Sequence, residues 1–226
     1  MLKSRKNFFE SISPKNKKIV IWGAGDQARV NLLILQSLGC EIIAFVDSTT
    51  GLDSPVKEIP IFQTGEDFLR WKVKSKHSNV GSVIAIGNPF AAKRIEYANF
   101  LKSNGIASES FADPTSFVRI NSILGEGLQV MPNVIVNNDV RIADQCILNT
   151  GSIIEHDCVL SSGVEVGPGA ILTGRVSVGE NTWIGAGAVV LPRLKIGSNV
   201  TVGAGAVVTK DVKDNAVVIG NPARQI

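Results

Sequence analysis

From Leu124 to Val208 every sixth residue is aliphatic, without exception. Neither the 3.6-residue period of an α-helix nor the two-residue period of a strand produces this spacing. A fixed short period means that each unit buries its apolar residue only by stacking on its neighbours, so the sequence predicts about five triangular coils of a parallel β-helix. The residues of this column are Leu124, Val130, Val136, Ile142, Leu148, Ile154, Leu160, Val166, Leu172, Val178, Ile184, Val190, Ile196, Val202 and Val208.

Two further columns keep the same register. Four residues after the aliphatic position stand small or apolar residues that would fill a narrow interior: Leu128, Val134, Cys146, Ser152, Cys158, Ala170, Ala188 and Ala206. Three residues after it stand mostly Gly, Asn or Asp, which tolerate the positive φ of a tight corner. These are Gly127, Asn133, Asp139, Gly151, Asp157, Gly163, Gly169, Asn181, Gly187, Asn199, Gly205 and Asp211. No six-residue unit is interrupted, so we expect no long loop before the C-terminal end.

Residues 18–113 show alternating strand and helix signals instead. This alternation predicts a small Rossmann-like parallel sheet of about three strands, with ligands at the carboxyl ends of the strands. Asn88 is placed to cap the last helix, with Pro89 at its first position. The predicted strands are 18–22, 41–46 and 82–86, and the predicted helices are 27–38, 65–72 and 89–103.

The first strand leads into Gly23-x-Gly25-x-x-Ala28, and Asp47 follows the second strand. In a nucleotide-binding fingerprint the glycines admit a phosphate to the helix N-terminus and the acid binds a ribose. A unit with about three strands is half of a full dinucleotide fold, which favours a mononucleotide or a nucleotide sugar. Alternatively, the glycines only make a tight turn from strand to helix, and Asp26 argues mildly against a phosphate there.

Composition bounds the remaining possibilities. The chain has 226 residues and a net charge of +3, with a basic arm over residues 1–17 that would touch phosphates or an anionic membrane, or be a solvated tail. We expect an α/β domain over 18–113 and the β-helix over 114–226. No apolar run reaches membrane-spanning length and no signal-peptide core is present, so we expect no integral membrane association. Three cysteines predict buried reduced thiols and a cytoplasmic protein, and no nucleic-acid partner is expected.

His156 is the residue best suited to chemistry. The other histidine, His77, lies in a polar stretch and is expected to be exposed, whereas His156 stands at an outward corner between Glu155 and Asp157. An imidazole beside a carboxylate can accept a proton near neutral pH. Alternatively, His156 is an ordinary surface residue and Asp157 only makes the turn. Gly174 occupies the same corner one coil on, and we expect it to leave space above the imidazole for an acyl donor.

Ala186 falls two units after Gly174, on another corner of the same prism. Slender β-helices bury more surface by associating, and closed three-fold symmetry suits a triangular prism. The sequence therefore predicts a homotrimer in which Ala186 approaches the corner of a neighbouring subunit and the active site lies between subunits.

At these residues the chain resembles the bacterial sugar acyltransferases with a left-handed β-helix. The resemblance rests on the six-residue units and on the segments 149–158, 172–174, 183–187 and 219–224. It is strongest to the sialic acid O-acetyltransferase and nucleotide-aminosugar N-acetyltransferase group, which includes the bacillosamine and perosamine enzymes. It covers almost the whole chain, because that group also carries a small N-terminal nucleotide-binding α/β domain.

The resemblance implies that His156 is the general base, with Asn149 and Glu155 lining the site. Either Asp157 or Glu155 would orient the imidazole. One departure concerns the acceptor: the related aminosugar enzymes often place a second histidine nine residues after the base, where this chain has Glu165.

The resemblance also implies where the two substrates bind. Backbone groups of Gly174 and Ala186 would contact the pantetheine arm of acetyl-CoA, and the coils through Gly203 and Ala204 would hold the rest of that cofactor. The residues implied at the nucleotide of the sugar substrate are Gly23, Gly25 and Asp47.

Together these features predict acetyl-CoA-dependent N-acetylation of a nucleotide-linked amino sugar for surface polysaccharide or glycan biosynthesis. We expect the amine to attack the thioester directly, without an acylated enzyme, because Cys158 falls in the interior column. A backbone N–H would stabilise the oxyanion. One alternative is O-acetylation of sialic acid or a related sugar, and another is a non-catalytic trimeric subunit that senses a nucleotide. Zinc-dependent hydration would need about three histidines per ion, so no metal is expected.

Overall fold

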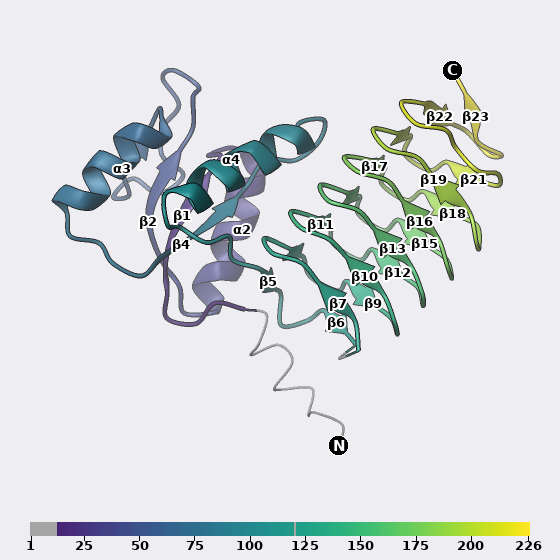
Figure 1. The fold of residues 1–226 in the computed structure, drawn as a ribbon, viewed down its shortest axis with the longest axis horizontal. Helices are drawn as coiled ribbons and strands as arrows, with labels where there is room; N and C mark the ends of the chain where they lie inside the picture. The colour runs from purple at the N-terminus through teal and green to yellow at the C-terminus, as the bar shows by residue number, and fades with distance from the viewer. Residues whose placement is uncertain (1–12, 120) are drawn as a thin grey trace. The chain divides into compact units, whose positions relative to one another are not determined.

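The computed structural model of the protein describes residues 13–119 and 121–226 (Figure 1). The chain divides into two compact units, with the division between Phe111 and Ala112, just before the boundary expected after residue 113. We call them the N-terminal unit and the β-helix unit. Of the predicted basic arm, residues 1–12 lie outside the described residues, and Lys17 forms an ion pair with Glu109 within the N-terminal unit.

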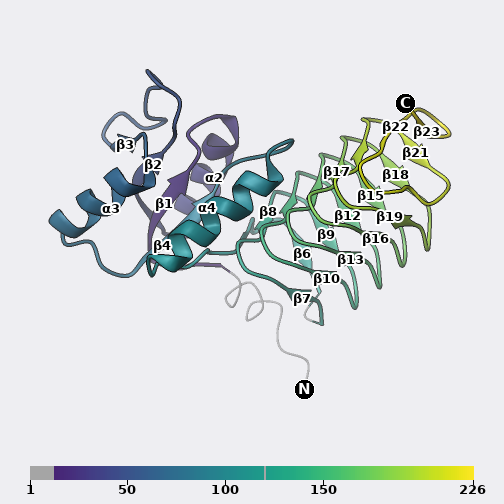
Figure 2. The same cartoon turned by 45° about the horizontal axis from the view of Figure 1, so that its top comes forward.

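The β-helix unit consists of three sheets, each built from one short strand of every successive coil, which appear as rows of short strands in Figure 2. All neighbouring strands are parallel except β22 and β23. The first sheet holds β5 (Phe111–Ala112), β8 (Gln129–Val130), β11 (Ile147–Leu148), β14 (Glu165–Val166), β17 (Trp183–Ile184), β20 (Thr201–Val202), β22 (Val217–Ile219) and β23 (Arg224–Gln225). The second holds β6 (Phe117–Val118), β9 (Ile135–Val136), β12 (Ile153–Ile154), β15 (Ile171–Leu172), β18 (Val189–Val190) and β21 (Val207–Val208). The third holds β7 (Ile123–Leu124), β10 (Arg141–Ile142), β13 (Val159–Leu160), β16 (Ser177–Val178) and β19 (Lys195–Ile196).

The interior is built as the sequence predicts. Every residue of the six-residue aliphatic column is buried except Leu124, and the whole column of small and apolar residues is buried too. Each strand pairs with the strand one coil on, as Ile153 does with Ile171. The apolar side chains of successive coils therefore stack into one continuous core, which a single coil could not form alone.

The corners confirm the predicted backbone conformation, with one exception. From Gly127 to Gly205 every sixth residue has a positive φ, including Gln145, Arg175 and Arg193. Asp211 does not share it, because the last coil is shorter: residues sixteen apart bond across it, and the Asp211 carboxylate accepts the backbone N–H of Lys195 at 2.8 Å.

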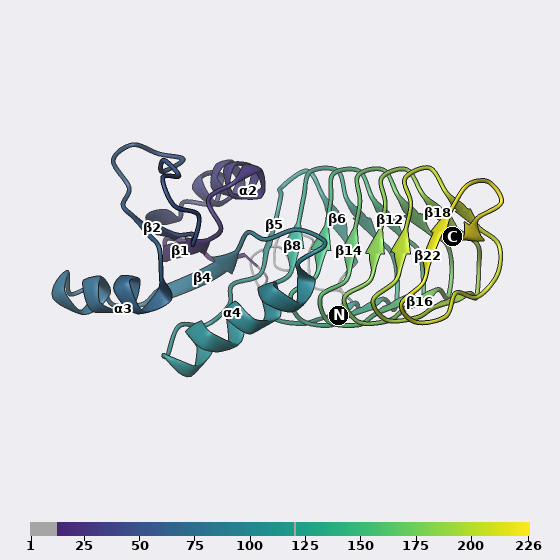
Figure 3. The same cartoon turned by 90° about the horizontal axis from the view of Figure 1, so that it is seen from above.

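The N-terminal unit is a four-stranded parallel sheet in the order β3-β2-β1-β4, with α2 on one face and α3 and α4 on the other (Figure 3). This confirms the small Rossmann-like sheet. Trp22, at the end of β1, stacks on Tyr97 of α4 with ring centroids 4.3 Å apart. The elements are β1 (Lys18–Trp22), α2 (Asp26–Ser37), β2 (Glu41–Val46), β3 (Ile61–Phe62), α3 (Gly65–Lys74), β4 (Val80–Ile84) and α4 (Ala91–Ser103).

Two features of this unit differ from the sequence prediction. The fourth strand, β3, has only two residues at the edge of the sheet, which is too short to give a periodic signal. The last helix begins at Ala91 rather than Pro89, and Phe90, not Asn88, is its N-cap. The reason is a turn in which the Phe90 N–H donates to the Gly87 carbonyl at 3.2 Å, so the first helical bond runs from Arg94 N–H to Phe90 O.

Some corner glycines are required by the approach of the next coil rather than by φ. A Cβ at Gly167 would lie 2.7 Å from the backbone nitrogen of Ala186 and 2.8 Å from the carbonyl oxygen of Ile184. Gly169, two residues on, has a φ of 64° but open space beside it among the described residues.

We therefore expect Gly167→Ala to destabilise the β-helix unit by about 1–3 kcal/mol, because backbone atoms must move to admit one methyl group. Gly169→Asn is the matched control and should cost less than about 0.5 kcal/mol, since Asn tolerates the left-handed conformation. Thermal unfolding measures both. Equal costs would show that the stacking of coils does not exclude a side chain at residue 167.

Candidate active site

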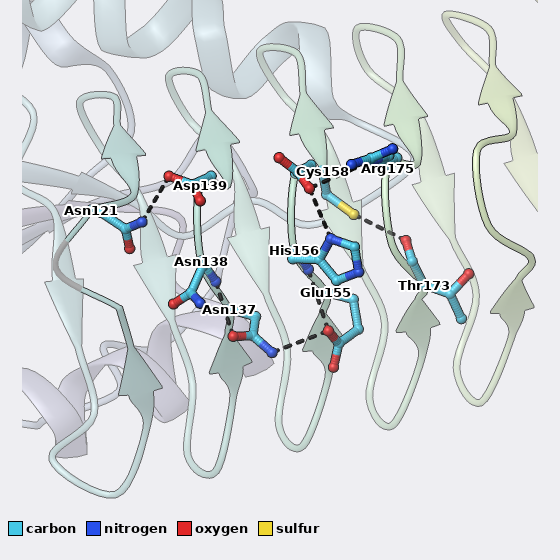
Figure 4. A network of polar contacts seen from close by, with 10 residues as sticks. Asn121, Asn137, Asn138, Asp139, Glu155, His156, Cys158, Thr173 and Arg175 are labelled. Atoms are coloured by element: carbon cyan, nitrogen blue, oxygen red, sulfur yellow. Dashed lines mark hydrogen bonds and ion pairs between the residues drawn. The ribbon is translucent and has the colours of Figure 1, made fainter.

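His156 lies at the corner that follows β12, between the second and third sheets (Figure 4). Its side chain is 53 % exposed. The corner is tight, since the Asp157 N–H donates to the carbonyl of Asn138 one coil before and Asp157 has a φ of 59°. The fold therefore holds this imidazole at the surface on a backbone that is bonded to the coils on both sides.

The imidazole is paired with Asp157. Its Nδ1 lies 2.8 Å from Oδ2 of that carboxylate. Hydrogen bonds from His156 first, and from Arg175 second, hold the pKa of the Asp157 carboxyl below its usual range. An ionised carboxylate at Nδ1 fixes the tautomer in which Nδ1 carries the hydrogen and Nε2 is free to accept a proton. Of the two candidates for orienting the ring, the structure thus favours Asp157.

Glu155 has a different set of partners. Its Oε2 accepts hydrogen bonds from Nδ2 of Asn137, one coil before, at 3.0 Å and from the backbone N–H of His156 at 3.3 Å. Glu155 therefore braces the backbone of the corner and leaves the ring to Asp157. Figure 4 shows this chain of contacts running across neighbouring coils.

Gly174 lies against the imidazole, one coil on. A Cβ built on Gly174 would come 2.5 Å from Nε2 and 2.7 Å from Cε1 of His156. From the sequence, this glycine was expected to leave space above the ring for an acyl donor. Instead, the ring itself lies in that space, because the side chain extends along the stacking direction toward the next coil. Gly174 therefore sets the position of the imidazole.

Asn149 and Glu165 form a second pair, on the first sheet and the corner after it. The Asn149 side-chain amide donates to Oε1 of Glu165 and to the carbonyl of Val166, both at 3.1 Å. Glu165 is only 9 % exposed. Within one chain these two residues lie along a different edge of the prism from His156.

Ala186 and Ala204 are exposed residues on successive coils, at the corner between the first and second sheets. Gly203 has a packing reason for lacking a side chain, since its Cβ would lie 2.7 Å from Cγ2 of Ile219. One chain thus places the predicted cofactor residues Ala186 and Ala204 at one edge of the second sheet, and His156 with Gly174 at the other.

Cys158 is not available as a nucleophile. It is fully buried in the interior column, and its thiol donates to the carbonyl of Thr173 at 3.1 Å. Burial raises the pKa of this thiol to about 11, which keeps it protonated. This confirms its expected interior position.

In the N-terminal unit the glycine-rich turn is held by Asp47. Its Oδ2 accepts the backbone N–H of Ala24 and its Oδ1 accepts that of Thr49, both at 2.9 Å. Gly23 has a φ of 101°, and a Cβ there would lie 2.4 Å from the carbonyl oxygen of Ala85. Gly25, in contrast, faces open space among the described residues. Gly23 and Asp47 therefore shape the turn, and Gly25 is the member of the fingerprint that a ligand can approach.

Sequence reasoning missed two hollows. One, of about 270 Å³, opens at the carboxyl edge of the sheet with walls from Trp22, Tyr97 and Phe100 and polar groups that include Ser48 and Gln63. Its residues come from β1, α3, α4 and the segments after β2 and β3, so only the Trp at the end of a strand signals it in the sequence.

The other hollow, of about 350 Å³, lies at the last coil and carries three cations, Lys210, Lys213 and Arg224, beside Asp211. Its sequence signal was the cluster of basic residues around the shortened coil.

Among residues 13–119 and 121–226, no group of three His, Cys, Asp or Glu side chains could hold a metal ion. No helix in the described part of the chain is long and apolar enough to cross a bilayer.

His77 is half-buried rather than exposed: its ring lies 4.9 Å from that of Trp71, and its Nδ1 lies 3.2 Å from Nζ of Lys18.

Two family models match the chain. The PglD N-terminal domain matches residues 18–97, and the bacterial transferase hexapeptide (six repeats) matches residues 175–210. A search of curated protein sequences finds no match.

Solved structures match almost the whole chain. It is 31 % identical to an alanine variant of GDP-perosamine N-acetyl transferase from Caulobacter crescentus in complex with CoA and GDP-perosamine, over 92 % of this chain and 96 % of that one (TM-score 0.83). It is 30 % identical to the acetyltransferase domain of PglB from Neisseria gonorrhoeae FA1090 in complex with acetyl coenzyme A, over 93 % and 100 % (TM-score 0.82). For WeeI from Acinetobacter baumannii AYE the identity is 26 %, over 93 % and 100 % (TM-score 0.81). These matches confirm the left-handed β-helix expected from the sequence.

The contacts of Asp47 make a testable prediction about the glycine-rich turn. Asp47→Ala should destabilise the N-terminal unit by about 1–3 kcal/mol, because two backbone N–H groups lose a charged acceptor. Urea unfolding followed by tryptophan fluorescence reports on this unit through Trp22 and Trp71. Asp53→Ala, at an exposed residue farther along the same loop, is the control. If both variants unfold at the same urea concentration as the unaltered protein, Asp47 does not hold the turn.

Proposed function

Because the chain belongs to the hexapeptide-repeat family of nucleotide-aminosugar N-acetyltransferases, we propose that it transfers an acetyl group from acetyl-CoA to the amine of a nucleotide-linked amino sugar. We further propose that the product serves surface polysaccharide or glycan biosynthesis and that the protein works in the cytoplasm. The cytoplasmic location is supported by its three cysteines, Cys40, Cys146 and Cys158, which are all buried as thiols.

The observation that carries this proposal is the pairing of His156 with Asp157 through Nδ1, which turns Nε2 of a half-exposed side chain toward Gly174. In the proposed reaction the amine nitrogen attacks the thioester carbonyl while Nε2 takes a proton from that nitrogen. The C–N bond forms and the C–S bond breaks. The CoA thiolate leaves and receives the proton from the imidazolium. Asp157 stabilises the imidazolium in between.

Direct transfer fits the residues better than an acetylated enzyme does. The cysteine nearest in sequence to His156, Cys158, points into the core as a protonated thiol. The acetyl group would therefore pass from sulfur to nitrogen in one exchange. A backbone N–H at the corner would stabilise the negative charge that develops on the carbonyl oxygen.

We place the nucleotide of the sugar substrate in the N-terminal unit. Ligands of parallel sheets bind at the carboxyl ends of the strands, where this unit has both the Gly23–Gly25 turn and the 270 Å³ hollow. The open approach to Gly25 suits a phosphate, and the walls of Trp22 and Tyr97 suit an aromatic base.

We place acetyl-CoA along the corner that carries Ala186 and Ala204. Small exposed residues on successive coils let an extended chain lie close to the backbone. The 350 Å³ hollow at the last coil is separate from this corner, because its Lys210 follows β21 at the edge of the second sheet that carries His156 and Gly174.

We also propose that the protein is a homotrimer with its active sites between subunits. The support is the second sheet, whose outward positions form an apolar ladder on which an identical surface would bury area. The two edges of this sheet carry the His156 corner and the Ala186 corner, so packing of neighbouring chains around it would bring base and cofactor together. The ladder consists of Phe117, Ile135, Ile153, Ile171, Val189 and Val207.

The proposed base makes a direct prediction. His156→Asn should lower kcat by about 10²–10⁴-fold, because general-base catalysis is lost, while the melting temperature stays unchanged because the side chain is at the surface. The measurement is acetyl-CoA turnover with nucleotide-linked amino sugars as acceptors. Retention of more than about a tenth of the unaltered kcat would remove His156 from this role.

Gly174 gives an independent test of the same geometry. Gly174→Ala should lower kcat at least about tenfold, since the new methyl group displaces the imidazole from its place against the next coil. Folding should be preserved, because the group that must move is a side chain at the surface. A well-folded Gly174→Ala variant with full activity would show that Nε2 need not lie at this position.

A further inference from the structure

We propose that Arg175 is a positioning residue, which holds the Asp157 carboxylate in the orientation that pairs with His156. The proposal rests on the proposed function, in which this pair takes the proton of the attacking amine.

Arg175 contacts both members of the pair. Its backbone N–H donates to the carbonyl of His156 at 2.9 Å, and its Nε donates to Oδ2 of Asp157 at 3.4 Å. The same Oδ2 accepts the hydrogen bond from His156 Nδ1. One carboxylate oxygen is thus shared by the imidazole of its own coil and the guanidinium of the next coil.

The side chain, rather than the backbone, is the distinctive part. Asp157 and Arg193 make the same backbone bond to the previous coil, from Asp157 N–H to Asn138 O and from Arg193 N–H to Gly174 O, both at 3.0 Å. Any residue other than proline at this position would keep it. Most positions of this column hold Gly, Asn or Asp, and between Gly127 and Gly205 arginine stands there only at Arg175 and Arg193, with φ of 65° and 64°. The conformation of the corner therefore does not explain why residue 175 is an arginine.

The charges around the ring explain why the carboxylate needs an anchor. Glu155 and Asp157 flank the imidazole on its own coil, Asp139 lies one coil before Asp157, and Arg175 is the cation one coil after. Asp157 is about half exposed, so without a second partner its carboxylate can turn away from Nδ1 toward water. A guanidinium on Oδ2 restricts this rotation and also offsets the repulsion between neighbouring carboxylates.

A double-mutant cycle tests the proposal. Arg175→Ala should lower kcat about three- to tenfold and leave the KM of acetyl-CoA and of the acceptor within about twofold, because the residue acts through Asp157 and not on a substrate. Asp157→Asn removes the charged partner while tolerating the corner. In that background Arg175→Ala should have no further effect. Arg193→Ala is the matched control, the same change at the same corner one coil on, and should match the unaltered protein.

Each contrary result overturns the proposal in a recognisable way. An equal fall in kcat with Asp or Asn at residue 157 would show that Arg175 does not act through the carboxylate. A rise in the KM of acetyl-CoA with kcat unchanged would make it a substrate contact, and full activity of Arg175→Ala would give it no role. If His156→Asn remains active, the proposed function fails, and that outcome is separate from the coupling between Arg175 and Asp157.

Discussion

The stacking of each coil on its neighbour in a fixed register is the constraint on which the rest of the protein depends. It buries the aliphatic column, and it also places every corner residue directly beside its equivalents one coil before and after. The surroundings of His156 follow from this register alone: Asn138 lies before it and Gly174 after it. Chemistry at such a corner is therefore specified by residues that are close in space because they occupy the same place in the repeat.

Much of this could be read from the sequence, because a repeat converts spacing into position. The interior columns, the positive-φ corners and the contact of Gly174 with His156 all follow from counting residues. What could not be read depends on side-chain direction. The imidazole fills the space beside Gly174 instead of leaving it open, and Asp157, not Glu155, faces Nδ1. In the N-terminal unit, the hydrogen bond from Ala24 N–H to Asp47 joins two segments that no short sequence pattern connects. The hollow with aromatic walls is likewise formed by segments far apart in the sequence.

The proposed base and the residues proposed to bind acetyl-CoA lie at different edges of one chain, which favours a site built from more than one copy of the chain. A single chain carries His156, the proposed base, at one edge of the second sheet and the small exposed corner residues Ala186 and Ala204 at the other. Residues fixed on different edges of a rigid prism cannot approach each other by bending. The proposed function would therefore require a neighbouring chain, packed against the apolar ladder of the second sheet.

Activity of mixed assemblies tests this account most directly. His156→Asn removes the base, and Ala186→Trp fills the corner assigned to acetyl-CoA, so each variant alone should be inactive. When equal amounts co-assemble, mixed trimers should contain one site that draws an unaltered His156 from one chain and an unaltered Ala186 from its neighbour. About a quarter of the unaltered activity should then return, because about three quarters of random trimers are mixed and each has one intact site of three. No recovery in verified mixed trimers would contradict a site shared between subunits.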